Sequence, residues 1–146
     1  RWLDWAVRFT GRLYVPWETI RVGVWQDEGV YLKLCNIDTG PSRWFSTAPI
    51  FFATSGTCGA PGVYDIEVGF YETWGEAVVI FIIGPEDRNE AYIPTIDGAW
   101  HCPNFNWRTG YCNTAWSFRP ASPSVPHFRG TNYTPGSTDG GGTPRP

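Results

Sequence analysis

The chain has 146 residues, of which 42% are hydrophobic and 17% aromatic, with nine Trp and no Met. This length and composition allow one compact domain with a buried core and exclude a wholly disordered chain. The net charge is −3 and the cationic residues form no basic cluster, which argues against nucleic acids and acidic membrane surfaces as partners. The longest apolar run, residues 77–83, is too short to span a bilayer.

Apolar and polar residues alternate along the first hundred residues, and this period of two predicts β-strands. In residues 7–15 the two faces are Val7, Phe9, Leu13 and Val15 on one side and Arg8, Thr10, Arg12 and Tyr14 on the other. Similar alternation recurs at 20–24, 30–34 and 65–70, with Gly or Pro between the segments. No segment of ten or more residues has a helical period. The pattern predicts an all-β fold, an antiparallel, jelly-roll-like β-sandwich.

Residues 24–34, VWQDEGVYLKL, contain two adjacent carboxylates, Asp27 and Glu28, directly before Gly29. Two interpretations fit this turn between alternating segments. The acids are either the solvated turn of a β-hairpin or part of a metal site, because calcium prefers carboxylate and carbonyl oxygens on irregular backbone.

Residues 76–83, EAVVIFII, are apolar after the first position. A strand without alternation is expected where both faces of a sheet are covered. We therefore place this segment at the centre of a sheet.

Four cysteines in a short chain predict two disulfides and an oxidising, extracellular or cell-surface location. Three pairings are open, and we favour Cys35 with Cys58 and Cys102 with Cys112, because each pair then encloses one irregular stretch. The second pair closes a small loop or hairpin. Asn132 begins the sequon Asn-Tyr-Thr, which fits the same compartment and makes Asn132 a candidate for N-glycosylation.

The composition changes at Ala121, after which Pro, Gly, Ser and Thr dominate. We divide the chain into a β-sandwich at 1–100, a Cys-closed extension at 101–120 and an extended tail at 121–146. Such a tail is typical of a disordered linker or stalk. Its bulky apolar residues, Val125 and Phe128, are the candidate anchors for packing on its own or a neighbouring subunit.

Three segments in this order resemble the protective-antigen-fourteen domain family. They are VRFTGRLYVP at 7–16, VGVWQDEGVYLKL at 22–34 and GVYDIEVGFYETWGEAVVIFIIGPE at 62–86, followed by Ile-Pro at 93–94. The family is a β-sandwich shared by anthrax protective antigen, yeast flocculins and many bacterial glycosidases. The resemblance covers roughly residues 4–97.

In lectin members of this family, two consecutive aspartates and a second loop hold calcium, and the calcium binds sugar hydroxyls. The resemblance therefore implies calcium as a cofactor, held by Asp27, Glu28 and, from the second loop, Glu72. It implies Tyr71 and Trp74 as glycan-binding residues. Glu28 departs from the family's Asp by one methylene. The alternative is that all three acids are solvated surface residues.

The family fold begins with an additional strand before the VRFTG segment, and only six residues precede Val7 here. Either the chain is a fragment of something longer, or one place in the sheet is open. The tail is a candidate to fill that place in its own subunit or in the next one, and head-to-tail strand addition builds polymers.

Motifs of catalysis are scarce. The two histidines, His101 and His127, match no zinc spacing, and no nucleophile elbow or phosphate loop stands in the chain. We therefore predict a non-catalytic structural subunit of an extracellular filament or coat, with copies of itself as partners. The alternative is a calcium-dependent module of an adhesin that binds cell-surface glycans.

Overall fold

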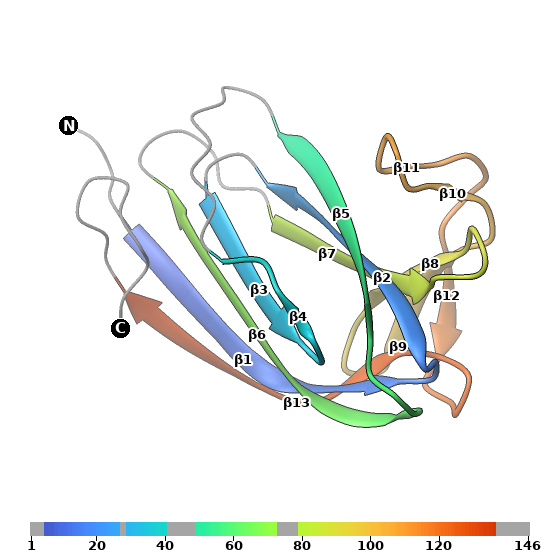
Figure 1. Cartoon of the computed structure of the whole chain (residues 1–146), viewed down its shortest axis with the longest axis horizontal. Helices are drawn as coiled ribbons and strands as arrows, with labels where there is room; N and C mark the ends of the chain where they lie inside the picture. The colour runs from blue at the N-terminus through green and yellow to red at the C-terminus, as the bar shows by residue number, and fades with distance from the viewer. Residues whose placement is uncertain (1–4, 27–28, 41–48, 73–78, 137–146) are drawn as a thin grey trace.

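The computed structural model describes residues 5–26, 29–40, 49–72 and 79–136. Within these ranges the chain forms thirteen β-strands and no helix. Two antiparallel sheets pack face to face, and a small third sheet lies beside them (Figure 1). The predicted all-β antiparallel sandwich is confirmed. None of the described residues belongs to a helix long and apolar enough to cross a bilayer.

The two large sheets differ in how their strands follow the chain. The five-stranded sheet has the order β13 (His127–Gly136), β1 (Trp5–Val15), β6 (Gly62–Glu72), β3 (Gly29–Leu34) and β4 (Ile37–Asp38). The six-stranded sheet has the order β12 (Ser117–Pro120), β9 (Gly98–Cys102), β8 (Ala91–Pro94), β7 (Val79–Pro85), β2 (Thr19–Gln26) and β5 (Ile50–Thr57). The third sheet is the hairpin of β10 (Phe105–Asn106) and β11 (Tyr111–Cys112).

The main core lies between the inner faces of the two sheets. Its fully buried side chains include Leu13, Ile20, Val22, Leu32, Leu34, Ile66 and Ile83. The faces predicted for residues 7–15 are confirmed, since Val7, Leu13 and Val15 are buried while Arg12 is exposed. Apolar burial of this kind is the main favourable term in folding.

A second apolar cluster covers the outer face of the six-stranded sheet. It consists of Ile82, Ala91, Cys102, Phe105 and Trp107. The rings of Trp107 and Phe51 pack so closely over this sheet that a Cβ at Gly23 would lie 2.4 Å from Phe51. Gly84 allows the same approach from Trp107. This cluster explains why β7 is apolar on both sides: Ile83 faces the main core and Ile82 faces the second one.

Both disulfides of the structure follow the pairing favoured from the sequence. Cys35–Cys58 joins the end of β3 in one sheet to the end of β5 in the other. Cys102–Cys112 joins β9 to β11 and thereby fastens the β10–β11 hairpin to the six-stranded sheet.

The tail takes part in the sandwich of its own chain. β13 pairs antiparallel with β1 from Ala6–Gly136 to Tyr14–His127, with one irregularity between Arg12 and Leu13 (Figure 1). Of the two alternatives for the open place, the structure therefore has the tail in its own subunit.

The two anchor residues accordingly serve the fold of one chain. Val125 is 6% exposed within the main core, and the ring of Phe128 meets that of Phe9 edge-on at 5.6 Å. Of the two alternatives for these anchors, packing on their own or on a neighbouring subunit, the structure has the first.

The predicted segment boundaries also differ from the structure. β9 runs through Cys102 and β12 lies at 117–120, so the six-stranded sheet crosses the boundary expected at residue 100. Residues 127–136 of the tail are a full strand of the other sheet.

Phe128→Ala should lower the free energy of unfolding by about 2–4 kcal/mol, because the ring packs on Phe9 and the main core. Arg129→Ala removes the exposed neighbouring side chain and is the control, with an expected change below about 0.5 kcal/mol. Urea denaturation followed by tryptophan fluorescence measures both. Equal midpoints for the two variants would show that the strand is not part of the cooperative fold.

Candidate functional site

The predicted calcium site falls at one end of the five-stranded sheet. Asp27, Glu28 and Trp74 lie outside the described residues, and for Tyr71 and Glu72 only the backbone is described. Gly29, at the start of β3, pairs with Tyr71 near the end of β6. The register therefore brings together the strand ends that flank the two predicted loops.

Gln26 is a residue at this end that sequence reasoning missed. It is 1% exposed at the last position of β2, where it pairs with Ile50 and Val79, and neither its amide nitrogen nor its amide oxygen has a hydrogen-bond partner. An unpaired buried amide costs roughly 1–3 kcal/mol. Position 26 continues the alternation in which Val22 and Val24 face the core, and a polar residue there is the signal in the sequence that marks Gln26.

Among the described residues, no group of three or more His, Cys, Asp or Glu is arranged to hold a metal ion. A calcium site in this protein therefore depends on Asp27 and Glu28, which remain predictions from the sequence.

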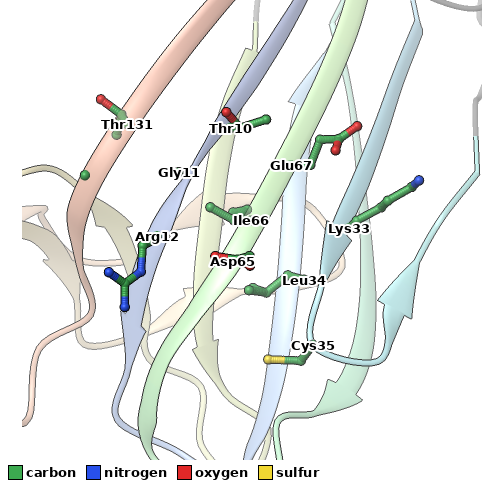
Figure 2. Close-up of a pocket in the computed structure, with 11 residues that line it drawn as sticks. Thr10, Gly11, Arg12, Lys33, Leu34, Cys35, Asp65, Ile66, Glu67 and Thr131 are labelled. Atoms are coloured by element: carbon green, nitrogen blue, oxygen red, sulfur yellow. The ribbon is translucent and has the colours of Figure 1, made fainter.

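An open groove of about 670 Å³ crosses the outer face of the five-stranded sheet (Figure 2). The strand register sets its residues in rows: Thr10, Glu67 and Lys33 form one row, and Arg12 and Asp65 form the next. Gly130 and Thr131 of β13 form one wall. The charges of its four ionisable side chains, Arg12, Lys33, Asp65 and Glu67, sum to zero.

An aromatic ring lies beside this groove. Tyr31 covers Gly69 so closely that a Cβ at Gly69 would lie 2.0 Å from the ring. Its hydroxyl donates a hydrogen bond of 2.5 Å to Oε2 of Glu67, and Nζ of Lys33 lies 5.9 Å from the ring centre. Burial, and then the bond to Glu67, raises the pKa of Tyr31, so the phenol stays protonated and its ring stays in place.

A smaller pocket of about 280 Å³ lies where the tail crosses β1. It is lined by Tyr14, Ala121, Ser122, Pro123, His127 and Arg129. Nδ1 of His127 donates a 2.7 Å hydrogen bond to the carbonyl of Val125. Tyr14 stacks beside the imidazole and donates a 2.7 Å hydrogen bond to the carbonyl of Pro123.

Asn132 lies in β13, opposite Thr10 of β1. The sequon is thus in the edge strand that borders the groove, and only its backbone is described.

A polar network surrounds Glu90 on the other sheet. Its Oε1 accepts from the Tyr92 hydroxyl at 2.7 Å and from Nε2 of His101 at 3.0 Å, while its Oε2 accepts from Nε of Arg88 at 2.7 Å. Burial alone raises the pKa of Glu90, but these three hydrogen bonds outweigh it and hold the pKa below the ordinary 4.5. The carboxylate is fully engaged by its neighbours, so the network stabilises the junction of β8 and β9.

An aromatic pair stands on the outer face near the free edge of the six-stranded sheet. Trp100 of β9 pairs with Phe118 of the edge strand β12, and their rings meet edge-on at 5.5 Å. They are 45% and 42% exposed, and Ile96 nearby in the chain is also exposed. We call these three residues the apolar edge.

The chain resembles a PA14 domain in a solved structure, that of the MpAFP antifreeze protein. The match has a TM-score of 0.48 and 15% sequence identity. It covers 56% of this chain and 43% of the antifreeze-protein chain, so this chain spans less than half of the length of that structure. No protein-family model matches the sequence, and no curated protein does.

PA14 is also the family that the sequence motifs resemble. At this identity the similarity concerns the fold alone. It carries nothing about what this chain binds, so function has to be argued from the chain's own residues.

Glu90→Gln should weaken the dependence of stability on acid. A carboxylate whose pKa is depressed in the folded state stabilises it above the unfolded pKa of 4.5, and this stability is lost as the pH falls through the folded pKa. The wild type should therefore lose more stability than Glu90→Gln between about pH 6 and about pH 3, as urea midpoints would measure. Glu86→Gln removes an exposed carboxylate and should behave as the wild type. Equal acid losses in the wild type and Glu90→Gln would contradict this role.

Proposed function

We propose that the protein is a non-catalytic, extracellular glycoprotein module that assembles with copies of itself into a filament or coat. The observation that carries this proposal is the apolar edge. Exposed aromatic side chains next to one another are enriched at protein interfaces, and a free strand edge can pair with a neighbour.

The geometry of β12 supports the proposal. All four residues of this strand are exposed, and it pairs with β9 on one side only, so the backbone groups on its other side remain available. The corresponding edge of the five-stranded sheet is taken by β13, and its opposite edge is the two-residue strand β4. The opposite edge of the six-stranded sheet is β5, so pairing of β12 with β5 of the next copy would join unlike surfaces and need not close, which is the condition for a filament.

Extracellular placement is supported by the two disulfides, which persist in oxidising compartments. N-glycosylation at Asn132 belongs to the same proposal. A glycan on β13 lies on the other sheet from β12 and leaves the apolar edge free.

The double variant Trp100→Ser, Phe118→Ser should be monomeric where the wild type assembles. Truncating the two central aromatic contacts should cost at least about 2 kcal/mol together, since such contributions are not additive, so the midpoint concentration for assembly should rise by at least about thirtyfold. Light scattering over a concentration series and electron microscopy of native material measure this.

Tyr111→Ser is the matched control, because Tyr111 is more exposed than either ring but lies on the β10–β11 hairpin. It should assemble as the wild type does. A wild type that stays monomeric at millimolar concentration, or a double variant that assembles unchanged, would overturn the proposal.

The second candidate function is a calcium-dependent, glycan-binding adhesin module. It is favoured by the pairing of Gly29 with Tyr71, which unites the strand ends flanking the two loops, and by the unpaired amide of buried Gln26 directly before Asp27. Asp27, Glu28 and Glu72 supply carboxylate oxygens for calcium, with Tyr71 and Trp74 beside the sugar.

Glu28→Asp provides a sharp test of this candidate. The shorter side chain restores the adjacent aspartates of the lectin members, so calcium should bind more tightly than in the wild type. Asp27→Ala should bind none, and Asp87→Ala, which removes an exposed acid elsewhere, should match the wild type. Calorimetric titration with calcium measures all four proteins. Absence of calcium-dependent heat in both the wild type and Glu28→Asp would remove this candidate.

A further inference from the structure

The outer face of the five-stranded sheet carries charges that the fold does not use. Arg12 and Asp65 are opposite each other in the register and both exposed, yet no ion pair joins them among the described residues. Lys33 and Glu67 are also neighbours in the register without an ion pair in that part of the chain, but Glu67 accepts the hydrogen bond of Tyr31 and Lys33 lies over the Tyr31 ring. Arg12 and Asp65 are therefore the charged pair that is available to a ligand.

The chemistry of these groups selects the ligand. Guanidinium and ammonium groups only donate hydrogen bonds and carboxylates only accept them, whereas a hydroxyl does both. A pair of neighbouring hydroxyls can therefore bridge Arg12 and Asp65, with Thr10 beside them. Because the four charges cancel, the groove has no net attraction for a polyanion or a polycation. A neutral, polyhydroxylated ligand satisfies every group.

The backbone of the groove disfavours an extended peptide. β1 is paired on both sides, by β13 and β6, and β6 is paired on both sides as well. Their N–H and C=O groups are already bonded within the sheet, while peptides that bind sheets add to a free edge. A ligand on this face has to be recognised by side chains.

Size and shape fit the same ligand class. The volume of about 670 Å³ lies in the range of small-molecule sites, which combine an aromatic or apolar surface with a few convergent polar groups. Leu34 and Ile66 supply the apolar part of the lining, between the charged rows of the neighbouring strands (Figure 2 shows Glu67 and Lys33 on adjacent strands).

We propose that this groove is a calcium-independent binding site for a neutral oligosaccharide, with Arg12 and Asp65 binding its hydroxyls. The site is separate from the predicted calcium loops. Asp65 is six residues from Tyr71, or about 20 Å along β6. It is also on the other sheet from the apolar edge.

The test is a printed glycan array that carries neutral and charged oligosaccharides, probed with the full chain in excess EDTA. The wild type should bind neutral glycans, and Arg12→Ala and Asp65→Asn should each bind them at least about tenfold more weakly, as expected for the loss of a charged hydrogen bond. Arg108→Ala removes an exposed arginine on the β10–β11 hairpin and should bind as the wild type. Thermal midpoints of all variants should match, since these side chains are exposed and unpaired.

Three outcomes would overturn the proposal. They are an array on which no neutral glycan is bound, binding that disappears in EDTA, and unchanged binding by both Arg12→Ala and Asp65→Asn. Loss of glycan binding in EDTA would point to the calcium loops. The proposed assembly through β12 is tested separately by the Trp100 and Phe118 variants.

Discussion

The pairing of β13 with β1 is the contact on which the rest of the molecule depends. It turns β1 from an edge strand into an internal strand, so that both sides of its backbone are hydrogen-bonded. The same segment brings Val125 and Phe128 onto the main core. It also supplies the wall of the groove, through Gly130 and Thr131, and the imidazole of the smaller pocket. A segment whose composition is typical of a linker therefore forms the edge strand of this sheet and part of its outer surface.

Closing one edge in this way divides the surface into parts with different chemistry. The five-stranded sheet ends in β13 and the short β4, and its outer face is polar. The six-stranded sheet ends in β12, where Trp100 and Phe118 are exposed. An apolar edge favours contact with protein and a neutral polar groove favours hydroxyl groups, and the two lie on different sheets. The proposed assembly and the proposed ligand binding therefore involve separate surfaces and would not compete.

Much of the fold could be predicted from the sequence, because alternation reports directly on burial. The faces of residues 7–15 and the central place of β7 follow from pattern alone, and the structure has the cysteine pairing favoured among the three open ones. From the sequence, the tail is a candidate to fill the sheet in its own subunit or in the next one. The sequence cannot decide between the two, because the pairing of β13 rests on backbone hydrogen bonds along β1, which leave no pattern in Gly, Thr and Pro. The groove escaped prediction for a similar reason: Arg12 and Asp65 lie far apart in the chain, and only the register of β1 and β6 makes them neighbours.

Glycines in the strands allow aromatic rings to pack closely on the outer faces of both sheets. Gly23 and Gly84 give Trp107 and Phe51 room to lie on the six-stranded sheet, and Gly69 does the same for Tyr31 on the other sheet. The two outer faces nevertheless differ in how far they are covered. On the six-stranded sheet Phe105 and Trp107, which belong to the disulfide-bound hairpin, bury that face, whereas Tyr31 beside the charged rows leaves the other face open. Both sheets have strands whose outer face could be covered. The outer face of the five-stranded sheet stays open because charged residues, Asp65 and Glu67, lie opposite Arg12 and Thr10.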